Sequence, residues 1–213
     1  MTDINDNGKK DKKEKKPLTY EIEQHFSESG FDPIAGCDEA GRGPLCGPVV
    51  AAAVILPRGV VIDGLDDSKK LSEKKREALF EEITQNALSY AIAEASVEEI
   101  DTLNIREASM LAMNRAVEML SVTPQLVLVD GNYASGFGIR AETVVHGDSV
   151  SPSIAAASIL AKVTRDRMCA ELDRLYPGYG IARHKGYATN AHYAAIKELG
   201  PSACHRKSFR LIK

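Results

Sequence analysis

Residues 34–56 read IAGCDEAGRGPLCGPVVAAAVIL, and this stretch decides the fold. Two apolar runs, 34–38 and 49–56, stand on either side of a loop that is rich in glycine and proline. Short apolar runs bordered by glycine and proline are typical of β-strands. We therefore expect two strands that form a hairpin, with the remaining elements built around it.

Helical and strand patterns alternate through the rest of the chain. Ser72 is a suitable N-cap for a helix to about residue 87, and Ser151-Pro152 is a suitable start for a long helix to Tyr176. Further expected elements are strands at 89–95, 126–129 and 143–145, two helices that meet near Asn104 within 98–120, and a last helix over 189–200. This alternation predicts an α/β fold with one central sheet and helices on its faces.

The composition is that of an ordinary globular protein. Of 213 residues, 44% are hydrophobic and 27% are charged, and this length favours a single domain, which we place at residues 17–213. Residues 1–16 carry six lysines and little apolar sequence, so we predict a disordered tail there. With no apolar run long enough for a bilayer, no signal-peptide core and four scattered cysteines, we expect a cytoplasmic protein without a disulfide framework.

The net charge of −3 conceals an asymmetry along the chain. Residues 151–213 carry 11 Lys and Arg against 4 Asp and Glu, whereas residues 1–150 carry 16 against 26. A basic C-terminal portion could bind phosphates and an acidic portion could hold a cation, which is suggestive of a nucleic-acid partner. The alternative is that the charges interleave in three dimensions and cancel.

Four carboxylates stand where apolar residues or turns would be expected. They are Asp38 and Glu39 at the end of the first strand, Asp130 after the strand at 126–129, and Asp148 before the long helix. Carboxylates at strand ends are costly to desolvate unless a cation pairs with them. Without histidines at ligand spacing, such a set suits hard cations such as Mg²⁺ or Mn²⁺. Two such ions can activate a water and stabilise the leaving oxygen in phosphodiester hydrolysis.

This interpretation has a geometric difficulty and an alternative. Adjacent strand residues point to opposite faces, so Asp38 and Glu39 share a site only if the strand bends, which the flanking glycines would permit. Any one acid could instead serve a turn, a cap or a surface salt bridge, and spacing alone leaves both possibilities open. The sequence has no G-K-[ST] phosphate loop, no G-x-S-x-G elbow and no H-E-x-x-H, and its five histidines are dispersed.

Several blocks of sequence, in a fixed order, together resemble one family. They are GCDEAGRGP at 36–44 followed by GPVVAAAV at 47–54, DSKKLS at 67–72, VDGN at 129–132, GD at 147–148 with IAAASILAKVTRD at 154–166, HKGYAT at 184–189 with His192, and HRKSF at 205–209. Over about residues 34–210 this set resembles the type 2 ribonuclease H family (ribonuclease HII). Type 3 enzymes typically carry an extra N-terminal domain and lack the DEAGRG form that is present here.

The resemblance implies a ribonuclease H-like fold, a central mixed sheet flanked by helices with a helical C-terminal portion. It implies that Asp38, Glu39 and Asp130 are the principal metal ligands and that Asp148 completes the acidic set. The cofactor would be Mg²⁺ or Mn²⁺, with two ions per site during catalysis. The implied activity is endonucleolytic hydrolysis of RNA paired with DNA, and cleavage 5′ of single ribonucleotides in duplex DNA, leaving 3′-hydroxyl and 5′-phosphate ends.

The resemblance also implies which residues bind the substrate. Gly41, Arg42 and Gly43 would read the ribose 2′-hydroxyl, largely through backbone groups. Tyr187 would pack against the sugar at the RNA–DNA junction. The expected phosphate contacts come from Lys69, Lys162, Arg165 and Lys185. The partners would be RNA–DNA hybrid and ribonucleotide-containing DNA. We expect the protein to act as a monomer and not to bind a membrane.

Two other functions stand beside this one. The first is a protein that keeps the fold and binds hybrids without cleaving them, which the intact acidic set disfavours. The second is a metal-dependent hydrolase of small phosphoesters, which the basic portion at 151–213 and the loop at 41–43 disfavour. A cleavage assay with and without metal tests the first, and comparison of a free nucleotide with a hybrid tests the second.

Overall fold

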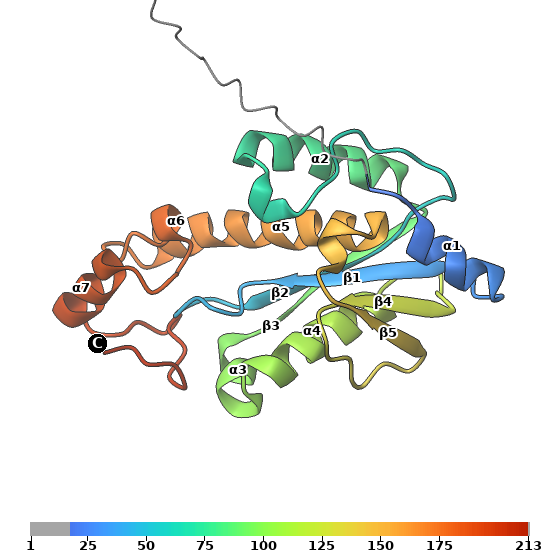
Figure 1. The fold of residues 1–213 in the computed structure, drawn as a ribbon. Coiled ribbons are helices and arrows are strands. Elements are labelled where there is room, and N and C mark those ends of the chain that lie inside the picture. The colour runs from blue at the N-terminus through green and yellow to red at the C-terminus, as the bar shows by residue number, and fades with distance from the viewer. Residues whose placement is uncertain (1–17, 213) are drawn as a thin grey trace, which may run out of the picture.

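The structure, a computed structural model, describes residues 18–212. Its five strands form one mixed sheet in the order β3-β2-β1-β4-β5 (Figure 1). The strands are β1 (Ile34–Ala40), β2 (Val49–Ile55), β3 (Ser89–Ala95), β4 (Leu126–Asp130) and β5 (Arg140–Val144). β1 pairs antiparallel with β2 and parallel with β4, so it lies at the centre of the sheet. The predicted tail, residues 1–16, lies outside the described residues.

Helices cover both faces of the sheet and extend beyond one end. They are α1 (Glu21–Glu28), α2 (Glu73–Asn86), α3 (Val97–Leu103), α4 (Ile105–Glu118), α5 (Pro152–Leu175), α6 (Ile181–His184) and α7 (Asn190–Leu199), with the 3₁₀ helices η1 (Ser68–Lys70) and η2 (Gly147–Ser149). In Figure 1, α5 lies along one face with α2 outside it, α3 and α4 lie on the other face, and α6 and α7 lie beyond the sheet. The predicted α/β fold with a helical C-terminal portion is confirmed.

The side chains of β2 show how one strand serves two cores. Ala51 and Ala53 pack in a cluster with α4, whereas Ala52 and Val54 pack in a cluster with α2 and α5. Successive side chains of a strand point to opposite faces, so a run that is apolar throughout is buried on both. All residues of β2 are buried. Each fully buried side chain of valine size stabilises the fold by roughly 1.5–3 kcal/mol.

Gly36 lets α5 approach the central strand closely. A Cβ at this position would lie 2.2 Å from the carbonyl carbon of Ser153 and 2.3 Å from the nitrogen of Ile154, which leaves room only for glycine. Residues two apart on a strand share a face, so Asp38 also faces α5. The contact at Gly36 therefore sets the distance between Asp38 and this helix.

Local capping explains where the predicted helices begin. The Ser72 side chain accepts a hydrogen bond from the amide of Lys75, and α2 begins at Glu73, directly after Ser72. Asn104 separates α3 from α4; its φ is 74°, and its side chain accepts from the amides of Arg106 and Glu107. Loss of such a cap costs about 1 kcal/mol. The expected helix starts at both positions are confirmed.

Several elements differ from the sequence prediction, among them α6, η1 and η2, which were not expected. β5 begins at Arg140 rather than at residue 143. Helix α1 was not expected, because its sequence EIEQHFSE offers few apolar residues. Its position is set by tertiary contacts: Oε1 of Glu23 accepts from Oγ of Ser151 at 2.6 Å and from the amide of Ser153 at 3.2 Å. These contacts lie at the start of α5 and cannot be foreseen from local sequence.

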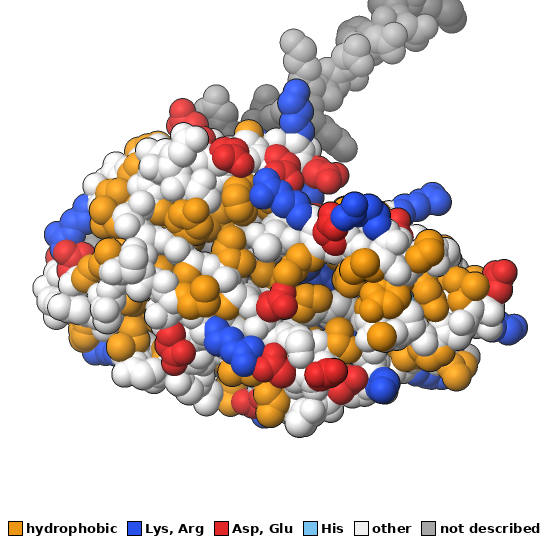
Figure 2. All heavy atoms as spheres, turned by 180° about the vertical axis from the view of Figure 1, so that it is seen from behind, with side chains coloured by type: hydrophobic (Ala, Val, Ile, Leu, Met, Phe, Trp, Pro, Cys, Tyr) orange, Lys and Arg blue, Asp and Glu red, His pale blue; other side chains and the backbone are white. Residues whose placement is uncertain are grey.

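The surface bears on the charge asymmetry. On the face shown in Figure 2, acidic and basic side chains are interspersed among apolar ones, without a single field of one sign. On this face, side chains of both charges therefore lie among one another. Among residues 18–212, no helix combines the length and the apolar character needed to cross a membrane.

Candidate active site

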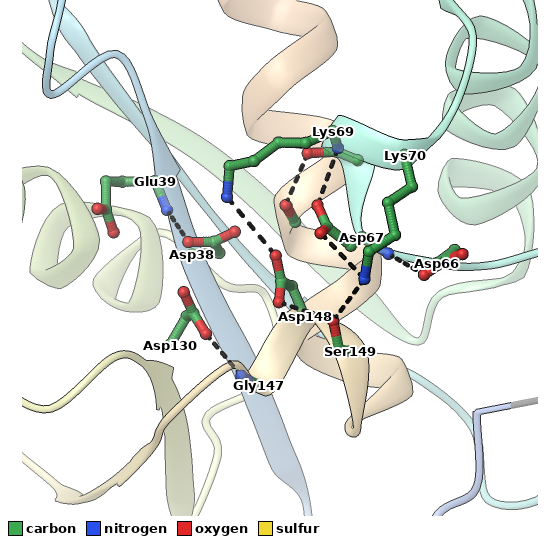
Figure 3. Close-up of polar contacts among 12 residues, drawn as sticks. Asp38, Glu39, Asp66, Asp67, Lys69, Lys70, Asp130, Gly147, Asp148 and Ser149 are labelled. Carbon is green, nitrogen blue, oxygen red and sulfur yellow. Dashed lines mark hydrogen bonds and ion pairs between the residues drawn. The ribbon is translucent and has the colours of Figure 1, made fainter.

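The predicted carboxylates come together at the end of the sheet where β1 and β4 have their carboxyl ends. β1 and β4 pair in parallel as far as Cys37 and Val129, so the residues that follow, Asp38 and Asp130, lie side by side. The carboxyl ends of parallel strands are a common place for sites in α/β proteins. Figure 3 shows all four predicted carboxylates around these strand ends.

The side chains of Asp38 and Glu39 leave the carboxyl end of β1 on opposite faces of the strand. The register between β1 and β2 is unbroken through Ala40, so no bulge separates the two acids, and the bend that the flanking glycines would permit does not interrupt the pairing. Instead β4 ends at Asp130, so on the side of β1 away from β2, Glu39 has no strand neighbour among the described residues. This open side of β1, rather than a bulge, lets both side chains line the same cavity.

Asp148 joins the cluster from η2, the turn that leads into α5. The amide of the preceding residue, Gly147, donates to Oδ1 of Asp130 at 2.7 Å, which ties η2 to the end of β4. Asp148 is 5% exposed. The chain therefore places Asp148 next to Asp130 through a backbone contact.

Burial and mutual repulsion raise the pKa values of Asp38, Glu39 and Asp148. Burial, followed by the charges of Glu39 and Asp130, raises the pKa of Asp38 well above its ordinary value. Burial also raises the pKa of Glu39, although Arg42 opposes the shift. Burial and then the charge of Asp130 raise the pKa of Asp148. A bound divalent cation would relieve the repulsion that hinders their joint ionisation.

Lys69 brings a positive charge to the cluster from the segment before α2. Its Nζ lies 3.7 Å from Oδ2 of Asp148, and Figure 3 shows the side chain reaching toward the carboxylates. Partial burial alone would lower the pKa of Lys69, but Asp38 and Asp148 raise it above its usual value. The neighbouring Lys70 donates to Oγ of Ser149 at 3.1 Å, which holds this segment against η2.

The cluster opens into a cavity of about 260 Å³. Its lining includes ten of the predicted site residues: Asp38, Glu39, Gly41, Arg42, Gly43, Lys69, Asp130, Lys162, Arg165 and Tyr187. Asp148 lies beside the cavity, and Lys185 is outside its lining. A larger hollow of about 920 Å³, between α1 and residues 60–66, contains none of the predicted site residues. The smaller cavity is the candidate site because the converging charges are there.

Tyr187 and the loop at 41–43 meet in this cavity. A Cβ at Gly43 would lie 3.4 Å from Cε1 of Tyr187, so the ring lies against the glycine backbone. Tyr187 is 48% exposed, which leaves part of the ring available to a ligand. Arg42 donates from Nη1 to Oε1 of Glu39 at 3.3 Å. The loop therefore contacts both the acidic cluster and the tyrosine.

The cations predicted to bind phosphate occupy different environments. Arg165 is 2% exposed, and its guanidinium donates to three backbone carbonyl oxygens. These belong to Cys46, Pro48 and Lys185. Arg165 thus supports the loop from beneath, and a phosphate contact does not fit its buried position. Lys162 lines the cavity while it donates to Asp166.

Arg206 was assigned no role from the sequence, yet it holds the whole loop. Its guanidinium is fully buried and donates to five backbone carbonyl oxygens. They belong to Gly41, Arg42, Pro44, Gly47 and Pro48. Burial, together with the like charge of Arg165, lowers the pKa of Arg206 to about 10. Arginines are mostly exposed, so only the block HRKSF pointed to this position.

Ser158 is a second residue that the sequence analysis passed over. It lies on α5, where its side chain forms a hydrogen bond to Asp38 that favours the ionised carboxylate. Its Oγ lies 3.0 Å from that of Ser68 in η1. A serine within an alanine-rich helix was the available signal, and it became informative only once α5 was seen to face Asp38.

The donor set fits a hard divalent cation. Four carboxylates converge, three of them with raised pKa values, and the lining of the cavity includes no histidine or cysteine among the described residues. Mg²⁺ and Mn²⁺ prefer oxygen ligands, whereas zinc prefers nitrogen and sulfur. Asp38, Glu39 and Asp130 could hold such an ion, with Asp148 next to them.

Comparisons with known proteins identify the family. The family model for ribonuclease HII matches residues 35–212. A curated ribonuclease HII from Burkholderia lata is 59% identical over 180 residues, which is 84% of this chain and 84% of that protein.

Solved structures share the architecture. The ribonuclease H2 from Pyrococcus horikoshii OT3 has a TM-score of 0.71 and 26% identity, over 84% of this chain and 94% of that chain. The ribonuclease HII of Archaeoglobus fulgidus, solved in a complex with PCNA, has a TM-score of 0.68 and 29% identity, over 82% and 92%. Bst-RNase HIII, solved with Mn²⁺, has a TM-score of 0.63 at 21% identity, over 84% and 67%, a likeness of fold alone.

The expected ribonuclease H-like fold is thereby confirmed. The family match spans nearly all of the described residues, and the relative from Burkholderia lata is similar over most of both chains. The chain therefore belongs to the ribonuclease HII family, and it is an endoribonuclease of the ribonuclease H type that acts on the RNA of RNA–DNA hybrids.

Proposed function

We propose that the protein also cuts 5′ of single ribonucleotides embedded in duplex DNA. The supporting observation is that the acidic cluster, the loop at 41–43 and Tyr187 line one cavity. A nuclease that recognises one ribonucleotide must sense a single 2′-hydroxyl beside the phosphate that it cuts. The proximity of the loop to the carboxylates would meet this requirement.

The proposed reaction depends on divalent cations, Mg²⁺ or Mn²⁺, with two in the site during catalysis. Asp38, Glu39 and Asp130 would hold them, with Asp148 beside them. Bound there, the cations would supply the positive charge that activates a water and offsets the charge of the leaving oxygen. The presence of Mn²⁺ in the structure of Bst-RNase HIII is consistent with this choice of ion.

The remaining charged residues of the cavity would orient the nucleic acid. Lys69 and Lys162 line the cavity and would attract the phosphates that flank the cut. Water attacks phosphorus, and the bond from phosphorus to the 3′-oxygen breaks. The products would carry a 3′-hydroxyl and a 5′-phosphate.

The loop would recognise the hydroxyl through amide groups. Arg206 occupies the carbonyl oxygens of Gly41 and Arg42. By contrast, the amide groups of Arg42 and Gly43 donate to no backbone acceptor within residues 18–212. Each of these amides shares a peptide group with a carbonyl that Arg206 holds, so its direction is fixed. Such amides could donate to a 2′-oxygen, and deoxyribose would leave them unpaired.

A four-way comparison tests the part assigned to Tyr187. Wild type and Tyr187→Ala are each assayed on a duplex with one ribonucleotide and on a full RNA–DNA hybrid. We expect Tyr187→Ala to lower cleavage at the lone ribonucleotide severely, by about a hundredfold, because a displaced sugar misaligns the reacting phosphate. Tyr187→Phe should retain more activity if packing dominates. No effect of Tyr187→Ala on either substrate would remove the tyrosine from recognition.

A further inference from the structure

Three histidines of the C-terminal portion, His184, His192 and His205, gather behind Tyr187. The rings of His184 and His192 are stacked with centroids 4.3 Å apart, and those of His192 and His205 lie 5.2 Å apart. The Nε2 atoms of His192 and His205 are 3.1 Å from each other. Both side chains are buried, with His192 at 0% and His205 at 1% exposure. Two buried imidazoles in direct contact must share one proton between those nitrogens.

The partners of the two rings fix where the protons lie. Nδ1 of His192 is 3.0 Å from the carbonyl oxygen of Tyr187, which can only accept, so this nitrogen carries a proton. The amide of Ser202 donates to Nδ1 of His205 at 3.0 Å, so that nitrogen carries the lone pair. His205 is therefore protonated at Nε2 and donates to the bare Nε2 of His192. Burial, before any other cause, lowers the pKa of His192, in keeping with a neutral ring.

A metal site is the competing explanation of this cluster. The Sγ of Cys46 and one nitrogen each of His192 and His205 all lie within 4.8 Å of one another, a set that zinc could use. The proton on Nε2 of His205 opposes this, because a protonated nitrogen is not a ligand. To ligate through Nε2, His205 would have to move its proton to Nδ1 and lose the hydrogen bond from Ser202.

The hydrogen-bonded chain ends on the backbone of Tyr187. The carbonyl oxygen of Tyr187 also accepts from the amide of Thr189 at 2.8 Å, and the Tyr187 amide donates to the carbonyl oxygen of His184 at 2.9 Å. The backbone is thus fixed on both sides, while the ring remains half exposed against Gly43. With a fixed backbone, few ring positions are open to the tyrosine.

The other end of this hydrogen-bonded chain, at His205, is anchored beside the segment that follows the loop at 41–43. His205 forms an isolated antiparallel bridge with Cys46, and the amide of Gly47 donates to the carbonyl oxygen of Cys204 at 2.9 Å. The segment that carries His205 therefore packs directly against the loop that carries Gly41 and Gly43. Movement of one element would be transmitted to the other.

We propose that His205, acting through His192, is a positioning residue that sets Tyr187 against the substrate sugar. This rests on the proposed role of Tyr187 in recognition. The ordered chain runs from the Ser202 amide through His205 and His192 to the Tyr187 carbonyl oxygen. Both histidines act as neutral rings with one proton each, and neither contacts the nucleic acid or the acidic cluster.

The first test reads the protons directly in the full chain, without substrate. Nitrogen-15 spectra of histidine side chains separate a protonated from a bare ring nitrogen. Near pH 7.5 we expect His192 protonated at Nδ1 and His205 at Nε2, unchanged by added zinc. A proton on Nδ1 of His205, or a zinc-dependent shift of both rings, would overturn the proposal.

The second test is a double-mutant cycle between His205 and Tyr187. His205→Leu should lower the turnover of a lone-ribonucleotide duplex by at least about tenfold in the wild-type background, because a small misplacement of the sugar is costly. In the Tyr187→Ala background the same change should cost no more than about twofold, because the positioned group is gone. His205→Gln, which keeps one donor and one acceptor, should recover part of the turnover.

Controls separate positioning from a general loss of structure. His25→Leu changes an exposed histidine of α1 and should behave as wild type. The affinity of His205→Leu for Mn²⁺, measured by calorimetry, should equal that of wild type, because the carboxylates are untouched. Losses that multiply in the double variant, or a silent His205→Leu, would overturn the proposal while the role of Tyr187 stands. A silent Tyr187→Ala would overturn both.

Discussion

Arg206 donates from Nη2 to the carbonyl oxygen of Gly41 at 2.6 Å, although the two residues lie near opposite ends of the folded chain. The same guanidinium binds four further carbonyl oxygens along the loop. A buried arginine whose hydrogen bonds all go to backbone groups fixes the path of that backbone. The conformation that would read a 2′-hydroxyl is therefore imposed by the C-terminal segment.

Replacement of Arg206 by lysine should damage the loop despite the retained charge. An ammonium group has three donors and cannot bind the five carbonyl oxygens that the guanidinium holds. We expect a loss of roughly 1–3 kcal/mol in the free energy of unfolding and lower cleavage of ribonucleotide-containing duplex. Urea denaturation and cleavage rates provide the measurement.

The matched control is Arg115→Lys. Arg115 pairs with Glu99 in a partly exposed salt bridge away from the cavity. Such a pair contributes at most about 1 kcal/mol, so stability and cleavage should both remain near wild type. Equal behaviour of the Arg115 and Arg206 variants would show that the loop does not depend on the buried guanidinium.

Gly41→Ala should abolish most of the activity for a steric reason. A Cβ at this position would lie 2.0 Å from Nε of Arg165, and the φ of 101° disfavours any side chain. Gly30 has a similar φ of 93° but nothing within 4 Å of its Cβ position. Gly30→Ala therefore carries the backbone strain, about 1–3 kcal/mol, without the clash.

The two glycine variants are compared in melting temperature and in kcat/KM. We expect both to be somewhat less stable, and Gly41→Ala alone to lose cleavage by about a hundredfold, since displacement of the loop misplaces the sugar. If Gly41→Ala cleaves as well as Gly30→Ala, the loop is not part of the recognition site.

The acidic residues could be predicted because each contradicts its local context. Asp38, Glu39, Asp130 and Asp148 occupy ends of elements where an unpaired carboxylate is costly, and this pattern is visible in the sequence. The α/β fold was likewise predictable, since apolar runs such as β2 are local signals. What local sequence could not supply was the way in which Asp38 and Glu39 share a site, because the end of β4 decides it.

The buried cations and the histidines could not be predicted for a related reason. Arg165 and Arg206 look like surface residues in the sequence, and only their contacts with distant carbonyl oxygens show that they are internal. His192 of α7 contacts His205, and His205 also bridges to Cys46, which lies far away in the chain. Long-range pairing of this kind leaves no periodic signal.

Neutralisation of a site carboxylate should stabilise the protein while it abolishes cleavage. The pKa of Asp38 in the folded state is raised above its unfolded value of about 3.9. Its contribution to stability is therefore complete below that unfolded value and is lost as the pH rises through the folded pKa. Without metal, Asp38→Asn should melt higher than wild type near pH 8, and the difference should shrink in acid.

The same substitution removes a proposed ligand for a hard cation, so cleavage should fall at least about a hundredfold. Glu39→Gln and Asp130→Asn should lose cleavage to a similar extent, and Asp148→Asn should be damaging but less so. Melting curves in a chelating buffer check the expected stabilisation, and cleavage assays with saturating Mg²⁺ check the expected loss of activity. A folded Asp130→Asn protein with near-normal turnover would remove that residue from the site.

Lys69→Met should strengthen metal binding and weaken substrate binding. The ammonium group of Lys69 now lies 3.7 Å from Asp148 and repels any cation that enters the cluster. The side chain is largely exposed, so screening limits the gain, and we expect Mn²⁺ affinity to rise by only about twofold to tenfold. Calorimetry gives the Mn²⁺ affinity, and salt-dependent duplex binding gives the lost phosphate contact. Weaker Mn²⁺ binding in Lys69→Met would contradict the geometry of the cluster.

One measurement tests the central claim directly: cleavage of an end-labelled DNA duplex that contains a single ribonucleotide, with Mg²⁺ or with a chelator. We expect one cut on the 5′ side of the ribonucleotide, with a 3′-hydroxyl end, only when the cation is present. We expect no cleavage of the same duplex when the ribonucleotide is replaced by a deoxyribonucleotide. Equal cleavage of the all-DNA duplex, or cleavage in the chelator, would contradict metal-dependent recognition of the 2′-hydroxyl.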